Sequence, residues 1–157
     1  MEKKSILVVD DDKAVLQSLK DYLQSKGYLT DTAENGKEAI EKSKAKHYNL
    51  ALLDIKLPDM EGTELLTKMH RTTPRMEKIM ITGYPNITNS VEAITKGADA
   101  YVIKPINPEE LLKVVEEKLK EQEEAEKMTK EKVTEWIKTR ARKIETTAKN
   151  SLYAPIS

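Results

Sequence analysis

Acidic side chains follow two apolar runs of the sequence at the point where each run ends. Asp10 and Asp11 come directly after Ile-Leu-Val-Val, and Asp54 directly after Leu-Ala-Leu-Leu. Taken singly, each acid would be interpreted as a solvated residue at the end of a strand. Taken together, the three carboxylates repel one another unless a cation holds them, and Mg²⁺ suits such a set of oxygen ligands. Lys104 and Thr82 follow two further apolar runs and supply an ammonium and a hydroxyl.

These groups have the chemistry needed for phosphoryl transfer. A carboxylate acts as a nucleophile toward a phosphoryl group. A metal ion, an ammonium and a hydroxyl then neutralise or hydrogen-bond the phosphoryl oxygens. Gly83, beside Thr82, leaves room for the incoming group. Asp12 is interpreted differently: it precedes an amphipathic helical pattern, so we expect it to cap that helix.

The elements that position these groups are short apolar runs alternating with helical patterns. The runs predict strands over 5–10, 28–33, 49–54, 78–82 and 100–103. The helical patterns lie between Asp12 and Gly27, over 36–46, 63–71 and 87–96, and from Pro108 onward. Buried strands separated by helices indicate an α/β fold with a doubly wound parallel sheet covered on both faces. Ligands bind such sheets at the carboxyl ends of the strands, where all five polar groups fall.

The same residues resemble the response-regulator receiver domains, over residues 4 to about 122. The resemblance rests on the segments ILVVDDD, LALLDIKLPDMEG, MITG and YVIKP, in that order. It implies a five-stranded CheY-like (flavodoxin-like) sheet of strand order 2-1-3-4-5, here followed by a C-terminal helical extension. It also implies a role in two-component or phosphorelay signalling.

The resemblance implies that Asp54 accepts a phosphoryl group from a sensor histidine kinase or a phosphotransfer protein. Mg²⁺, or Mn²⁺ as the alternative ion, would be held by Asp11, Asp54 and the backbone carbonyl of Lys56. Asp10 would belong to the same metal site, acting mainly through water. The chain would phosphorylate itself and slowly lose the phosphoryl group, without turning over an external substrate as an enzyme does.

Further roles follow from the same resemblance. Thr82 and Lys104 would bind the phosphoryl oxygens, and Thr82 and Tyr101 would form a switch pair. A cis peptide bond is expected between Lys104 and Pro105. The phosphoryl state would alter the surface formed by residues 87–122, through which an output partner or a second copy binds.

Two other functions are compatible with parts of the sequence. A haloacid-dehalogenase-like phosphatase also opens with an apolar strand that runs into Asp-x-Asp, with Asp10 as nucleophile and Asp12 as acid/base. That interpretation leaves Asp54 unexplained, and no strand after Lys104 ends in the acidic pair that such enzymes use for metal. The second alternative is a pseudo-receiver that binds partners without phosphorylation.

Composition sets the remaining limits. The chain of 157 residues contains no cysteine, which excludes disulfides and thiolate metal sites. The two histidines, His47 and His70, lie far apart and are expected to be solvated helix residues. No stretch approaches the roughly 20 apolar residues of a membrane span, so we expect a cytoplasmic protein without a membrane partner.

The charge distribution suggests an appendage. Residues 1–125 carry 19 basic and 23 acidic side chains, whereas residues 126–157 carry 8 and 4. We expect a receiver over 1–122, a helical extension over 123–150 and a flexible terminus over 151–157. Val133, Ile137 and Ile144 recur at helical spacing beside Trp136, so this stripe is expected to pack on the receiver or in a dimer. The basic run over 138–143 is expected to be a solvated helix face rather than a nucleic-acid site.

Overall fold

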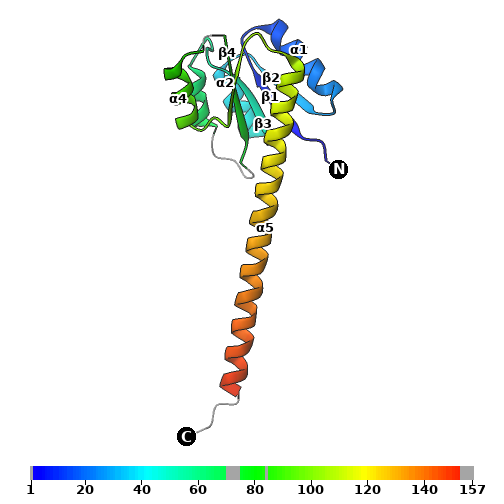
Figure 1. The fold of residues 1–157 in the computed structure, drawn as a ribbon, viewed down its shortest axis with the longest axis vertical. Coiled ribbons are helices and arrows are strands. Elements are labelled where there is room, and N and C mark those ends of the chain that lie inside the picture. Colours follow the sequence, from blue (N-terminus) through cyan, green and yellow to red (C-terminus); the bar gives the residue numbers. More distant parts are fainter. Residues whose placement is uncertain (1, 70–74, 84, 153–157) are drawn as a thin grey trace. The chain divides into compact units, whose positions relative to one another are not determined.

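Strands and helices alternate along the chain in the computed structural model, which describes residues 2–69, 75–83 and 85–152 (Figure 1). The strands are β1 (Ser5–Val9), β2 (Leu29–Ala33), β3 (Leu50–Asp54), β4 (Glu77–Thr82) and β5 (Ala100–Ile103). The helices are α1 (Lys13–Ser25), α2 (Gly36–Ala45), α3 (Gly62–Lys68), α4 (Ile87–Thr95) and α5 (Pro108–Leu152). Every element that the apolar runs and helical patterns predict is present.

The strands form one parallel sheet of order β2-β1-β3-β4-β5, which confirms the predicted doubly wound fold. The chain first moves outward from β1 to β2 and then crosses to β3 on the other side of β1. The carboxyl ends of β1 and β3 are therefore neighbours at the point where the strand order reverses. Sheets of this kind bind their ligands at that point.

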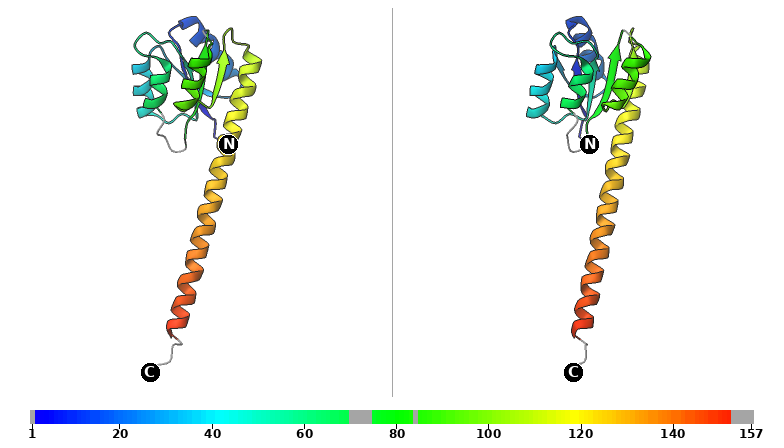
Figure 2. Two further views of the ribbon diagram at one scale, coloured as in Figure 1. Left: turned by 60° about the vertical axis from the view of Figure 1, so that its left-hand side comes forward. Right: turned by 90° about the vertical axis from the view of Figure 1, so that its left-hand side faces the viewer.

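Helices cover both faces of the sheet (Figure 2), and apolar side chains fill the two layers between them and the strands. On one face, Leu16 and Leu23 of α1 and Val115 of α5 pack against the strands. On the other, Ala39 of α2, Leu66 of α3 and Ala93 of α4 do the same. Strands buried on both faces need no polar alternation, which explains the continuous apolar runs in the sequence.

The helix ends follow local chemistry. Asp12 caps α1 as predicted: its Oδ1 accepts from the backbone N–H groups of Ala14 at 2.9 Å and Val15 at 3.3 Å. Gly27 follows α1 with a φ of 94°, a conformation that favours glycine. The helix predicted over 63–71 instead begins at Gly62 and ends at Lys68.

The structure describes one of the two histidines. His47 is exposed, as expected, but it lies in the loop after α2 rather than in a helix, because α2 ends at Ala45. His70 lies outside the described residues, together with the rest of 70–74.

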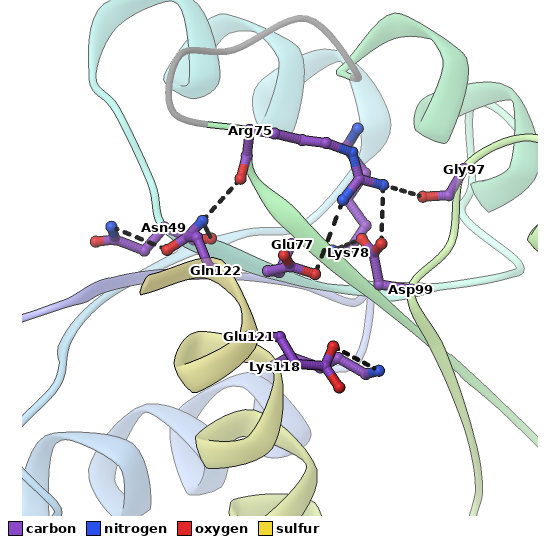
Figure 3. Close-up of polar contacts among 9 residues, drawn as sticks. All are labelled: Asn49, Arg75, Glu77, Lys78, Gly97, Asp99, Lys118, Glu121 and Gln122. Carbon is purple, nitrogen blue, oxygen red and sulfur yellow. Dashed lines mark hydrogen bonds and ion pairs between the residues drawn. The ribbon is translucent and has the colours of Figure 1, made fainter. Parts of the chain in front are cut away.

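Gln122 connects α5 by hydrogen bonds to the segments that lead into β3 and β4. Its side-chain amide donates to the backbone carbonyls of Asn49 at 2.8 Å and Arg75 at 2.7 Å (Figure 3). These two carbonyls lie just before β3 and β4, and each finds a donor in the same buried side chain. The compact unit Met1–Gln122 ends at this residue.

The second unit begins at Glu123, and α5 remains helical through Leu152. Trp136, Ile137 and Ile144 of the predicted stripe are all more than half exposed. The Arg140 guanidinium lies 5.0 Å from the centre of the Trp136 ring. Packing of this stripe stays a prediction, and residues 153–157 of the predicted flexible terminus lie outside the described residues. Among the helices that the structure describes, none is long and apolar enough to cross a membrane.

Gly62 lets the first turn of α3 pass directly behind Asp54. A Cβ atom at Gly62 would lie 2.3 Å from the Asp54 carbonyl oxygen and 2.8 Å from the Ile55 Cα. Neither backbone atom can retreat without moving β3. The chain therefore needs a residue without a side chain here, and the end of β3 is fixed by this close approach.

We expect Gly62→Ala to destabilise the protein by about 1–3 kcal/mol, the usual cost of forcing extra atoms into a packed site. Urea denaturation measures the effect. Gly83→Ala is the matched control, because a Cβ there would meet the Lys104 side chain at an ordinary 3.9 Å. Equal losses of stability in the two variants would contradict the role given to Gly62.

Candidate functional site

Three carboxylates meet at the carboxyl ends of β1 and β3. Asp10 and Asp11 follow β1, and Asp54 is the last residue of β3. One ligand oxygen from each of the three lies within 4.8 Å of the others. Asp10 and Asp54 are buried, whereas Asp11 is exposed. Because β1 and β3 pair in parallel, with Val9 opposite Leu53, their ends deliver these side chains to one place.

Lys104 brings a positive charge to the two buried carboxylates. Its ammonium lies 3.0 Å from the Asp10 Oδ2 and 3.3 Å from the Asp54 Oδ2. The Lys104 backbone N–H donates to the Thr82 carbonyl at 2.7 Å, which fixes the residue after β5 against the end of β4. The peptide bond between Lys104 and Pro105 is cis, as expected.

The electrostatics of the site follow from this crowding. Burial raises the pKa of the Asp54 carboxyl, the nearby Asp10 carboxylate raises it further, and the Lys104 ammonium only partly opposes both effects. Burial alone would lower the pKa of Lys104, but the hydrogen bond and charge of Asp10, together with Asp54, raise it above its usual value. The site therefore holds more negative charge than its one lysine neutralises.

Backbone N–H groups orient the two buried carboxylates. The Asp10 Oδ1 accepts from the N–H of Asp12 at 2.9 Å, and the Asp54 Oδ1 accepts from the N–H of Lys56 at 3.3 Å. The second bond places the Lys56 peptide beside the phosphoacceptor candidate. Three carboxylates with an uncompensated charge and only oxygen ligands fit a hard divalent cation such as Mg²⁺. The Lys56 carbonyl as a fourth ligand stays a prediction.

Thr82 and Tyr101 share one face of the sheet. Tyr101 pairs with Met80, two residues before Thr82, so the two side chains project to the same side of β4 and β5. Thr82 is buried at the end of its strand. The Tyr101 hydroxyl is buried and has no hydrogen-bond partner among the described residues. The tyrosine ring packs against the apolar cluster that contains Ala93 of α4.

Asp59 is a residue of this site that the sequence did not reveal. Its two carboxylate oxygens accept from the backbone N–H groups of Gly36 at 2.8 Å and Lys37 at 2.9 Å, at the N-terminus of α2. These bonds lower the pKa of Asp59 and anchor the loop that follows Asp54. The sequence separation of 23 residues gives no local signal for the contact.

Comparison with known proteins decides the family to which this arrangement belongs. Residues 6–116 match the model of the response regulator receiver domain. The chain is a member of that family. Receivers are signalling domains of two-component systems rather than enzymes that turn over an external substrate.

This receiver is 39% identical over 109 residues to the transcriptional regulatory protein SrrA of Staphylococcus aureus. The match covers 68% of the chain but only 44% of SrrA, so the chain spans less than half the length of that relative.

Solved structures give the same result. A CheY-like response regulator receiver domain protein from Methanospirillum hungatei JF-1 is 52% identical, with a TM-score of 0.77, covering 79% of this chain and 99% of that one. The receiver domain of a LuxO repressor protein from Vibrio parahaemolyticus is 28% identical, with a TM-score of 0.74, covering 80% and 96%.

We expect Asp54→Asn to raise the unfolding midpoint of the receiver at neutral pH in metal-free buffer. The unfolded chain loses the Asp54 proton at its ordinary pKa, and the folded chain loses it only at a higher one, so stability falls as the pH rises between the two values. The variant lacks this penalty, and its advantage should shrink as the pH falls toward about 4.

Thermal unfolding of both proteins across this pH range measures the difference. Asp12→Asn serves as the control, because asparagine also caps a helix and Asp12 lies outside the carboxylate cluster. A wild type that gains stability relative to Asp54→Asn as the pH rises would contradict the expected sign.

Proposed function

We propose that this receiver accepts a phosphoryl group on Asp54 from a histidine kinase or a phosphotransfer protein, in a Mg²⁺-dependent reaction. The phosphoryl state then changes an interaction surface within residues 87–122. The observation that carries the proposal is the buried Asp54 carboxylate, which lies 3.3 Å from the Lys104 ammonium and has an oxygen within 4.8 Å of oxygens of Asp10 and Asp11.

In the proposed reaction an Asp54 carboxylate oxygen attacks the donor's phosphorus atom. The new oxygen–phosphorus bond forms as the donor's phosphorus–nitrogen bond breaks, and the electron pair leaves on the donor's imidazole nitrogen. Lys104, already poised between the two buried carboxylates, pairs with a phosphoryl oxygen, and the Thr82 hydroxyl donates to another. Attack by water on the acyl phosphate later releases phosphate and restores the Asp54 carboxylate, which ends the phosphorylated state.

The metal site in this proposal consists of Asp10, Asp11, Asp54 and the Lys56 backbone carbonyl. A bound Mg²⁺, or Mn²⁺ with the same oxygen ligands, supplies positive charge that offsets the carboxylate repulsion and the charge of the phosphoryl group. Asp10 has shorter contacts than Asp54: it lies 3.0 Å from the Lys104 ammonium and 2.9 Å from the Asp12 N–H, whereas both corresponding contacts of Asp54 measure 3.3 Å. These shorter contacts agree with a role for Asp10 mainly through water.

A cavity beside Lys104 supports a docking surface for the phosphodonor protein. It has a volume of about 410 Å³ and is lined mainly by apolar groups of α1 and the segment after β5, including Val15, Leu19, Pro105 and Ile106. Lys104 also lines this cavity, so a helix seated there would approach the phosphoacceptor site. An apolar surface next to a charged site suits a protein donor, whereas a small phosphodonor needs only the site.

Phosphorylation with a small phosphodonor and Mg²⁺ should label Asp54, as located by mass spectrometry of the trapped acyl phosphate. Asp54→Asn should abolish labelling, and Asp12→Asn should retain it. Label on Asp10 with none on Asp54 would support the haloacid-dehalogenase alternative. Absence of label with several donors and Mg²⁺ would support the pseudo-receiver alternative.

The proposed output surface carries exposed apolar side chains. Ile87, Val91 and Ile94 recur along one side of α4 and are 84%, 57% and 64% exposed, and Ile103 at the end of β5 is 54% exposed. Thr82 and Tyr101 lie on the strands next to this surface. Movement of the Thr82 hydroxyl toward a phosphoryl group would change the packing around the Tyr101 ring, which already faces inward, and would shift α4 and β5. The occupant is an output partner or a second copy.

Beryllofluoride with Mg²⁺, a mimic of the phosphoryl group, should change amide hydrogen exchange across residues 87–103 more than across α1 or α2. Asp54→Asn should show no change, because the mimic has no carboxylate to bind. Light scattering on the same samples identifies association of copies. Unaltered exchange over 87–103 while fluorine NMR reports bound beryllofluoride would contradict the proposed surface.

A further inference from the structure

A second cavity, with a polar lining, lies near the amino-terminal ends of the strands. Asp54 lies at their carboxyl ends. The cavity has a volume of about 430 Å³ and lies between the C-terminal ends of α3 and α4 and the start of β4. Its lining is Thr67, Arg75, Lys78, Thr95, Lys96 and Gly97. Three of these residues are cationic, two carry hydroxyls, and no described residue of the lining is acidic. Figure 3 shows Arg75, Lys78 and Gly97 gathered at this end of β4.

Lys78 is the unusual member of this set. Its side chain is fully buried, and its ammonium has no hydrogen-bond partner among the described residues. Two neighbouring acids contact other groups: Asp99 accepts from the Arg75 guanidinium at 2.8 Å and from the Lys78 backbone N–H at 2.8 Å, and Glu77 lies 3.8 Å from the Arg75 guanidinium. An ammonium buried without a partner is costly, so a lysine at this position needs an explanation.

The surroundings of Lys78 disfavour its charge. Burial and the Arg75 charge lower the pKa of Lys78 to about 8, against the opposing effect of Asp99 and Glu77. Glu77 compensates only weakly, because its own pKa is raised by burial and by the Asp99 carboxylate. Asp99 and Glu77 therefore offset the charges of Lys78 and Arg75 only in part.

Helix ends explain only part of this cationic lining. Positive side chains stabilise the free carbonyls at helix C-termini. Arg75 does so, since its guanidinium donates to the Gly97 carbonyl at 3.4 Å, and Lys96 lies at the end of α4 paired with Glu92 at 2.9 Å. Lys78 makes no such contact with a carbonyl in the described structure. Its ammonium is enclosed at the wall of the cavity, where an anion would be its only hydrogen-bond partner, since it has none among the described residues.

We propose that this cavity binds a small oxyanion of the phosphate type, through Lys78, Arg75 and Lys96. Such an anion supplies the missing partner of Lys78 and accepts several charge-assisted hydrogen bonds at once. The Arg75 side chain is 52% exposed, so an anion in the cavity can approach its guanidinium. The site lies apart from the phosphoacceptor Asp54 and would respond to free phosphate, or to the phosphoryl group of a larger molecule, rather than to a kinase.

The test is thermal unfolding and amide NMR of the whole chain in metal-free buffer, with inorganic phosphate as the probe and chloride at equal ionic strength as the reference. At ten times the dissociation constant we expect phosphate to raise the unfolding midpoint by about 3–6 °C. The largest amide shifts should lie at Thr95, Lys96 and Gly97. Shifts confined to residues 10–12 and 104, or a response equal to that of chloride, would overturn the proposal.

Variants separate binding from structure. Lys78→Met should keep or raise the midpoint without phosphate, because an unpaired buried charge is removed, and should weaken phosphate binding about ten-fold or more. Lys96→Gln should weaken it several-fold. Its matched control is Lys68→Gln, since Lys68 pairs with Glu64 at 3.1 Å in the last turn of α3, just as Lys96 pairs with Glu92. An unchanged response in both Lys78→Met and Lys96→Gln would refute the site.

A phosphomonoester in a second arm distinguishes the source of the anion. Stronger binding than inorganic phosphate, lost in Lys78→Met, assigns the site to a phosphorylated metabolite. Weaker binding assigns it to free phosphate. If Lys78→Met binds both anions as tightly as the wild type does, the proposal is overturned for either source.

Discussion

Repulsion between carboxylates, held in check by one lysine, is the interaction on which this molecule depends. Asp10 and Asp54 are buried at neighbouring strand ends, and the Lys104 ammonium contacts both. One positive charge cannot neutralise two buried carboxylates and the exposed Asp11 beside them. The folded chain therefore carries an electrostatic cost that a metal ion or a change of charge at Asp54 alters directly. A site of this kind is poised to respond to charge.

The fold sustains this cost through backbone contacts that leave little freedom at the site. The hydrogen bond between Lys104 and Thr82 joins β5 to β4, and Gly62 presses α3 against the end of β3. Asp59 anchors the intervening loop to α2. Each contact involves main-chain atoms, so the positions of the charged groups are set by the path of the chain. Side-chain packing on both faces of the sheet supplies the compensating stability.

Much of this arrangement could be predicted from the sequence because a simple rule governs parallel sheets. Asp10, Asp54, Thr82 and Lys104 each follow an apolar run, and the carboxyl ends of parallel strands meet at one edge. The contacts of Asp59 and Lys78 could not be predicted in this way. Asp59 acts through a loop whose path no periodicity encodes, and Lys78 reads as a polar residue at the start of a strand. Its complete burial depends on how α3 and α4 end.

The Tyr101 hydroxyl is buried without a hydrogen-bond partner among the described residues, which affects the energy of the position that its side chain occupies. Such a group loses its hydration without regaining a bond, at a cost of about 1–3 kcal/mol. The contacts of the ring with the apolar cluster oppose that cost, and the proposed switch would require the inward position of the tyrosine to be only weakly favoured over an outward one. Two conformations separated by so little energy exchange their populations when a single charge-assisted hydrogen bond is gained or lost nearby. In the proposed switch, an imperfectly satisfied Tyr101 side chain would thus make the domain sensitive to the phosphoryl state, where a fully bonded one would hold it in one state.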